Sequence, residues 1–232
     1  MLIQHMNPKP ITVLLAEDHQ IVREGFRALL RHESDIQVVG EAETGRQAVQ
    51  LTRKLRPAVV VMDIAMPLLN GLEATRQIRK EMPATRVLVL SAHSDDAYVE
   101  QVMALGAAGF LLKQTSSHVL AKAIREVQKG NTFFTPDISR RLQNGHATPL
   151  ERTRPSRKKG NLLSSREREV LQLIAEGLPN KQVAAELGVS FKTVDKHRQH
   201  LMTKLNIHDI AGLTRYAIAE GIIESTVRIK IT

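Results

Sequence analysis

The chain of 232 residues has no cysteine and no tryptophan, and aromatic residues make up only 3% of it. Without cysteine it can form no disulfide, no thiolate zinc site and no thiol nucleophile, which fits a reducing, cytoplasmic setting. No apolar run approaches the roughly 20 residues of a membrane span. The segment Met1–Pro10 is too short and too polar for a secretion signal. We therefore expect no membrane partner.

Acidic residues are also in deficit, because 33 Lys and Arg face 24 Asp and Glu and leave a formal net charge of +9. A basic excess favours a polyanionic partner, either nucleic acid or an anionic membrane surface. Since neither a span nor a signal is evident, nucleic acid is the better interpretation. Hydrophobic residues make up 42% of the chain, so leucine, isoleucine, valine and alanine are numerous enough to build hydrophobic cores.

Short apolar runs alternate with amphipathic stretches through the first half of the chain. The runs are Ile11–Ala16, Ile36–Val39, Ala58–Met62, Val87–Leu90 and Gly109–Leu112. Their Val, Ile and Leu content is typical of strands that are buried on both faces of a parallel sheet. About five such βα units predict an α/β fold over residues 9–130, a doubly wound parallel sheet with helices on both faces.

The alternation fades after Gly130. The residue types predict a turn over Asn131–Pro136 and a short helix over Ile138–Leu142. Beyond them, residues 144–160 combine Pro, Gly and a basic run with almost no apolar residues. We interpret residues 131–160 as a basic, largely flexible linker. Its charge is either simply solvated or a nonspecific tether to DNA phosphates.

Residues 161–225 have the pattern of a second, smaller, all-α domain. The predicted helix boundaries come from capping residues and glycine: Ser164 with Glu167 starts the first helix and Gly177 ends it, Asn180 caps the second, Ser190 caps the third over Phe191–Leu205, and the fourth runs from about Asp209 to Glu220. A tight Gly-containing turn joins the second and third helices, which is typical of a helix-turn-helix.

Polar side chains end four of the five predicted strands. Glu17 and Asp18 follow the first strand, Asp63 the third, Ser91 the fourth and Lys113 the fifth. Ligands of open α/β sheets bind at the carboxyl ends of the strands, so these side chains should lie close together. Carboxylates crowded in a low-dielectric crevice repel one another, and Mg²⁺ removes that cost with oxygen ligands.

Such a set of side chains suits phosphoryl transfer. The Asp63 carboxylate would attack phosphorus, Lys113 and Mg²⁺ would neutralise the transferred oxygens, and Ser91 would donate a hydrogen bond to the product. Any one of these residues could simply be a helix cap or a surface charge, but five at successive strand ends favour a site.

The motifs around these residues resemble the receiver domains of response regulators, which have a flavodoxin/CheY-like fold. They are Leu14-Leu15-Ala16-Glu17-Asp18-His19, Val61-Met62-Asp63-Ile64-x-Met66-Pro67, Leu90-Ser91-Ala92 and Gly106-Ala107-x-Gly109-Phe110-Leu111-Leu112-Lys113. The resemblance implies that Asp63 accepts phosphate from the phosphohistidine of a sensor histidine kinase.

The same resemblance implies further roles. Asp18, Asp63 and the backbone carbonyl of Ala65 would bind Mg²⁺ directly, with Glu17 acting partly through water. Ser91 and Phe110 would form a switch, although Phe110 could also be an ordinary core residue of its strand.

Three positions depart from the usual receiver pattern. The acidic pair is Glu-Asp where Asp-Asp is commonest, and Gln114 follows Lys113 where many receivers have Pro. Leu68-Leu69-Asn70-Gly71 replaces a more usual Gly-x-Asp-Gly loop. None of these departures removes a chemical role.

In the C-terminal part, one face of the third predicted helix is polar while Val194, Leu201 and Leu205 point into the core. A polar face of this kind can enter the major groove, and its residues are Thr193, Asp195, Lys196, Gln199 and His200. Lys181 and Lys204 are placed to meet phosphates.

Three further motifs resemble the LuxR-type helix-turn-helix: Ser164-Ser165-Arg166-Glu167-Arg168-Glu169-Val170-Leu171, Asn180-Lys181-x-Val183-Ala184 and Thr193-Val194-x-x-His197-Arg198. With the receiver, they make the chain similar to NarL/FixJ-type response regulators. The resemblance implies that the third helix, His197 included, contacts DNA and that the fourth helps two copies dimerise. Metal binding by His197 and His200 is not expected, because no third ligand is evident. Asp195 sits where the family commonly has Lys, and it either accepts from a base or pairs with a neighbouring basic residue.

Two rival functions remain open at this point. A Mg²⁺-dependent phosphatase could use Asp63 as its nucleophile, but such enzymes usually need a second acid two residues on, where this chain has Ala65. We therefore expect no enzyme beyond slow self-dephosphorylation. A receiver that binds its partner without phosphorylation is the other rival.

Overall fold

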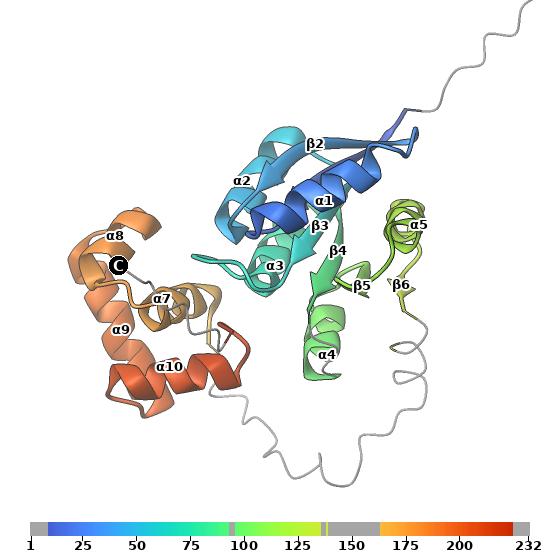
Figure 1. Cartoon of the computed structure of the whole chain (residues 1–232). Coiled ribbons are helices and arrows are strands. Elements are labelled where there is room, and N and C mark those ends of the chain that lie inside the picture. The colour runs from blue at the N-terminus through green and yellow to red at the C-terminus, as the bar shows by residue number, and fades with distance from the viewer. Residues whose placement is uncertain (1–8, 93–95, 136–137, 139–162, 225–232) are drawn as a thin grey trace, which may run out of the picture.

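The computed structural model describes residues 9–92, 96–135, 138 and 163–224 (Figure 1). The N-terminal part consists of β1 (Ile11–Ala16), α1 (Gln20–Leu30), β2 (Ile36–Ala42), α2 (Gly45–Leu55), β3 (Val59–Asp63), α3 (Gly71–Glu81), β4 (Arg86–Ser91), α4 (Asp96–Ala104), β5 (Gly109–Leu112), α5 (Ser117–Gln128) and β6 (Phe133–Phe134). The C-terminal part consists of α7 (Ser165–Ala175), α8 (Asn180–Leu187), α9 (Phe191–Leu205) and α10 (Ile210–Ala219).

All strands pair in parallel, in the order β2-β1-β3-β4-β5-β6. The predicted doubly wound α/β fold is therefore confirmed. The chain reverses its direction of winding between β1 and β3, which lie side by side with Ala16 opposite Met62. In sheets of this type, the crevice outside that switch point is where ligands bind.

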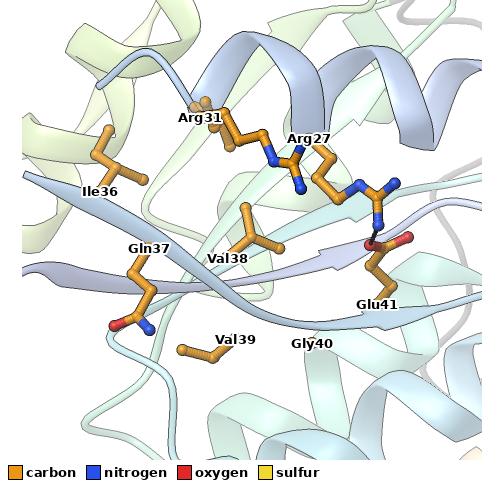
Figure 2. Close-up of a pocket in the computed structure, with 9 residues that line it drawn as sticks. Arg27, Arg31, Ile36, Gln37, Val38, Val39, Gly40 and Glu41 are labelled. Atoms are coloured by element: carbon orange, nitrogen blue, oxygen red, sulfur yellow. Dashed lines mark hydrogen bonds and ion pairs between the residues drawn. The ribbon is translucent and has the colours of Figure 1, made fainter. Parts of the chain in front are cut away.

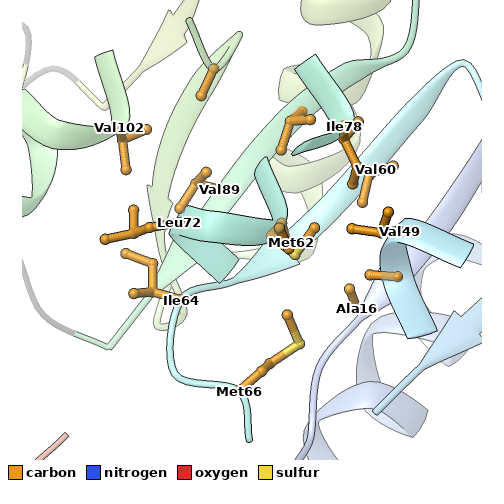
Figure 3. Close-up of a cluster of buried hydrophobic side chains, with 14 of the residues drawn as sticks. Ala16, Val49, Val60, Met62, Ile64, Met66, Leu72, Ile78, Val89 and Val102 are labelled. Atoms are coloured by element: carbon orange, nitrogen blue, oxygen red, sulfur yellow. The ribbon is translucent and has the colours of Figure 1, made fainter. Parts of the chain in front are cut away.

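Each face of the sheet has its own hydrophobic cluster. The face covered by α2, α3 and α4 buries Val60, Met62 and Val89 against helix residues such as Ile78 and Val102 (Figure 3). The face covered by α1 and α5 buries the alternate strand residues. Alternation of side chains along each strand explains this division, because successive residues point to opposite faces.

The turn predicted over Asn131–Pro136 is wrong, because Phe133 and Phe134 form β6 and pair with β5. The Phe133 N–H donates to the Ala108 carbonyl at 3.0 Å. A Cβ on Gly109 would lie 2.4 Å from the Phe133 carbonyl oxygen, so glycine allows this close approach. Two residues are too few to show the period of a strand in sequence.

The linker was predicted to begin at residue 131, but residues 133–134 belong to the sheet, so any linker begins after them. Ile138 is helical and only 2% exposed in the cluster shared with α4. The rest of the predicted helix over 138–142, and the linker from 139 to 160, lie outside the described residues.

The C-terminal helices begin and end largely at the predicted residues. Ser164 and Glu167 form the capping box, Gly177 has φ +88°, and the Ser190 hydroxyl accepts from the Thr193 N–H. The cap predicted at Asn180 is wrong by one residue, because Pro179 takes that position with φ −69°. None of the helices in the described ranges is long and apolar enough to cross a membrane.

Candidate functional site

The carboxylates predicted at the strand ends come together at the switch point. Asp63 ends β3, while Glu17 and Asp18 follow the neighbouring strand β1. Ligand atoms of these three side chains and of His19 all lie within 4.8 Å of one another. The parallel pairing of β1 and β3 produces this cluster, because both strands end at the same edge.

Lys113 and Ser91 come to the same place from β5 and β4. The Lys113 Nζ lies 2.9 Å from Asp63 Oδ2 and 2.8 Å from Glu17 Oε2. The backbone N–H of Lys113 donates to the Ser91 carbonyl at 2.8 Å, and Ser91 is only 3% exposed. A buried hydroxyl-bearing residue and an ammonium group therefore border the carboxylates.

The electrostatics of the site are those of crowded negative charge. Asp63 is 1% exposed. Burial raises its pKa to about 6 and the Glu17 charge adds to the rise, while Lys113 opposes it. Burial alone would lower the pKa of Lys113, but the facing carboxylates outweigh that and the net direction is upward.

This donor set fits Mg²⁺. Glu17, Asp18 and Asp63 offer only oxygen ligands, and their charges exceed the single positive charge of Lys113. Burial and the Glu17 charge both raise the pKa of Asp63, and a bound cation would act in the opposite direction by stabilising the ionised carboxylates. Ala65, two residues after Asp63 in the loop between β3 and α3, is half-buried.

Two residues of the site were missed by the sequence reasoning. Arg23, only 7% exposed, donates to the Glu17 carbonyl at 2.7 Å and to Glu43 at 2.8 Å. It therefore fixes the backbone that carries the acidic pair. His19, at the N-cap of α1, also lies with Nδ1 2.9 Å from Asp18 Oδ1. The signal for Arg23 is its position: a charged side chain on the core-facing side of an amphipathic helix is unusual and indicates a buried partner.

Phe110 is fully buried and lies opposite Val89 in the β4–β5 pairing. Its ring is part of the cluster on the α2–α4 face of the sheet. The placement suits both interpretations of this residue, a core position and an inward-turned switch ring, so the Ser91–Phe110 switch stays a prediction.

A separate pocket lies between α1 and the edge strand β2 (Figure 2). Arg27 and Arg31 border it on one side and residues 36–41 on the other. Arg27 already donates to Glu41 at 3.2 Å. None of the lining residues belongs to the carboxylate cluster, so the pocket is no part of that site.

The outer face of α9 has the predicted exposure. Val194 and Leu201 are fully buried, while Lys196, Gln199 and His200 are exposed. The other predicted DNA contacts range from half-buried to exposed: Thr193, Asp195, His197, Lys204 and, on α8, Lys181.

Several of these side chains have partners within the domain. Asp195 accepts a hydrogen bond from Gln199 at 3.1 Å. The Lys204 Nζ lies 2.8 Å from Glu167 Oε2, and His200 lies 3.3 Å from the same carboxylate. Burial would raise the pKa of Glu167, but Lys204 and the Ser164 N–H hold it below its usual value.

Comparison with known proteins identifies both parts of the chain. The response regulator receiver domain family matches residues 13–125, and the luxR family of bacterial regulatory proteins matches residues 161–217. DegU, a transcriptional regulatory protein of Brevibacillus brevis, is 34% identical over 229 residues, covering 94% of this chain and 97% of that protein. The oxygen regulatory protein NreC of Staphylococcus epidermidis is 36% identical over 215 residues, covering 91% and 99%.

Among solved structures, the RcsB response regulator of Salmonella typhimurium is 30% identical, with a TM-score of 0.56. The match covers 91% of this chain and 99% of that one. The matches extend over receiver and helix-turn-helix together, in the same order. The chain therefore belongs to the NarL/FixJ family of two-component response regulators, transcription factors with a receiver and a LuxR-type DNA-binding domain.

Proposed function

We propose that Asp63 accepts a phosphoryl group from the phosphohistidine of a sensor histidine kinase and that this event controls DNA binding by α9. The observation that carries the proposal is the burial of Asp63 between two further carboxylates and the Lys113 ammonium, at the switch point of the sheet. The cognate kinase and a second copy of the chain are the protein partners that this function requires.

The chemistry follows from the positions of these groups. An Asp63 oxygen forms a bond to phosphorus while the P–N bond of the phosphohistidine breaks and its electron pair returns to the imidazole. Lys113 neutralises charge on the transferred oxygens, and Ser91 donates a hydrogen bond to the acyl phosphate. Asp18, Asp63 and the Ala65 carbonyl would hold Mg²⁺, with Glu17 acting partly through water, and the bound ion would supply further charge neutralisation.

On the DNA side, α9 would enter the major groove with Asp195, Lys196 and Gln199 near base edges. Thr193, Lys181 and Lys204 would hold phosphates, and His197 and His200 would lie close to the duplex. The net charge of +9 and the exposure of the outer face of α9 support this assignment. The similar RcsB structure was described for its interaction with DNA.

Two copies would bind paired half-sites and associate through α10, where Ile210 is 50% and Ile218 is 38% exposed. Since bacterial DNA lies in the cytoplasm, a regulator of this kind acts there.

Acetyl phosphate with Mg²⁺ tests the phosphoacceptor. Intact mass spectrometry should show one added phosphoryl group on the wild type and none on Asp63→Asn. Asp35→Asn is the matched control, because the Asp35 carboxylate pairs with Arg125 and lies outside the carboxylate cluster. It should be labelled like the wild type.

The rival functions predict other outcomes of the same incubation. Multiple turnover of acetyl phosphate would indicate a phosphatase. Absence of any labelling would indicate a receiver that works without phosphorylation, and labelling of Asp63→Asn at the wild-type level would reject Asp63.

A further inference from the structure

Phe191, the first residue of α9, carries an aromatic ring that its own domain leaves open to solvent. Ser190 caps the helix just before it, and the Ser190 hydroxyl accepts from the Thr193 N–H at 3.1 Å. Phe191 is 57% exposed, although phenylalanine is among the residues most often buried. Tyr216, the other aromatic residue within 163–224, is half-buried against the hydrophobic cluster of the domain.

The position of Phe191 matters more than its exposure, because single apolar side chains are common on protein surfaces. Phe191 lies at the N-terminal end of α9, and the N-terminal residues of a recognition helix are those that contact base edges. Asp195 follows it by four residues and Gln199 by eight. Since residues four apart are neighbours on a helix surface, the three side chains form one row along α9.

The row has an apolar end and a polar middle. Gln199 Nε2 donates to Asp195 Oδ2 at 3.1 Å, so the amide and the carboxylate are held as a pair. The other oxygens of this pair, Asp195 Oδ1 and Gln199 Oε1, are acceptors, whereas the Phe191 ring makes no conventional hydrogen bond. The row therefore suits an apolar group that lies close to a hydrogen-bond donor.

The major groove of DNA offers this combination. Its one apolar group is the 5-methyl of thymine, and its donors are the exocyclic amines of adenine and cytosine. Guanine presents only acceptors there and would repel a carboxylate. One helical turn, the spacing of Phe191 and Asp195, is about 5.4 Å, and base pairs are about 3.4 Å apart. The two groups that the row contacts should therefore lie within about two base pairs of each other.

Charged neighbours favour DNA over a protein as the partner of Phe191. Lys192 follows the ring and Lys196 follows Asp195, and both lysines are exposed. Ammonium groups in these positions suit a polyanion with methyl groups in its groove. They would be costly in the apolar centre of a protein interface, where charged residues are depleted.

We propose that Phe191 is a specificity-determining residue that contacts the 5-methyl group of a thymine, while Asp195 accepts from an adenine or cytosine amine nearby. The inference rests on the proposed entry of α9 into the major groove. Phe191 then distinguishes thymine from cytosine, which carries hydrogen in place of the methyl group. Asp195 excludes guanine from the position that faces it.

Replacement of thymine by uracil tests the contact, because it removes only the methyl group and keeps the base pair. Binding-site selection with the full chain, acetyl phosphate and Mg²⁺ first gives the half-site, and each thymine is then replaced in turn by deoxyuridine. At one thymine of each half-site the wild type should lose about fourfold in affinity, the factor for one methyl group withdrawn from apolar contact. Phe191→Ala should bind the two duplexes equally, and both more weakly than the wild type binds the thymine duplex.

Two further variants make the comparison sharper. Phe191→Leu keeps an apolar side chain and should retain part of the discrimination. Leu29→Ala is the matched control, because Leu29 is an apolar residue of α1 that is 41% exposed, and it should discriminate like the wild type. Selection on Asp195→Ala should lose preference within about two base pairs of the same thymine.

The inference is overturned if no uracil replacement separates the wild type from Phe191→Ala. It is also overturned if Phe191→Ala still loses about fourfold on the uracil duplex, or if the preference lost in Asp195→Ala lies elsewhere or nowhere. If the wild type selects a half-site in these cases, DNA recognition by α9 stands and only the role of the row fails. If the wild type selects no sequence at all, the proposed function fails and the inference falls with it.

Discussion

The carboxylate site and the outer face of α9 are built in opposite ways. Asp63 is 1% exposed and has an ammonium 2.9 Å away, whereas Lys196 and Gln199 are open to solvent. The first site is preorganised by strand ends that the sheet holds in register. The second is a surface whose specificity arises only when a duplex supplies the partner groups. Substitutions should therefore change stability and chemistry in one region and DNA preference alone in the other.

The largest expected effect is a loss of stability on the buried side of α9. It shows that only the outer face of this helix is free of a structural role. Leu201→Ala removes a fully buried side chain and should lower the free energy of unfolding of the helical domain by about 2–5 kcal/mol. Gln199→Ala, on the outer face, should change it by less than about 0.5 kcal/mol. Urea unfolding followed by circular dichroism measures both, and equal losses would contradict the assignment of the two faces.

Asp63→Asn should stabilise the receiver in Mg²⁺-free buffer. Burial holds the pKa of Asp63 at about 6 against an ordinary 3.8, which corresponds to a cost of about 3 kcal/mol for the ionised fold. Because the folded pKa is the higher one, wild-type stability falls as the pH rises from 4 through 6. The gain of the variant should be full above pH 6 and vanish near pH 4. Thermal unfolding against pH tests this, and a gain that grows on acidification would reject it.

Asp195→Ala sharpens the picture of the exposed face. If Asp195 accepts from a base, about 1–3 kcal/mol of preference should disappear at one position of each half-site. If it only orients Gln199, with which it is hydrogen-bonded, the change should instead follow that of Gln199→Ala. Binding-site selection on both variants separates these accounts, and an unchanged motif at every position would exclude both.

The smallest effect is expected for Lys204→Ala. A phosphate contact predicts uniform weakening across sequences and a salt slope reduced by about one. The pair with Glu167 predicts a stability loss of at most about 1 kcal/mol with no change of salt slope. Titrations at several salt concentrations distinguish them, and an unaltered slope would remove Lys204 from the DNA contacts.

The sequence predicted the carboxylate cluster well because strand ends in a parallel sheet converge by geometry alone. Asp63 and Lys113 needed only an apolar run before each of them to be placed. The position of Arg23 on the core-facing side of α1 could indicate that it is buried, but its partner, the backbone carbonyl of Glu17, could not be predicted from the sequence.

Contacts between distant parts of the chain also explain why other predictions from local sequence were wrong or incomplete. Asn180 is a good capping residue, but Pro179 occupies the cap and the Asn180 side chain accepts from Arg198 instead. Leu68 packs against the helical domain and its N–H donates to Glu176, more than 100 positions away, so no window of sequence could reveal this contact. The unusual loop was visible in the sequence, but its partner was not.

The sixth strand has a practical consequence for anyone who divides the protein. A receiver cut after Gly130, where the helical pattern of the sequence ends, would lose β6 and leave the outer edge of β5 without its pairing partner. An unprotected parallel edge is a template for pairing with other chains. Such a fragment should self-associate at high concentration, whereas one that retains Phe133, Phe134 and the buried Ile138 should stay monomeric in the absence of phosphate.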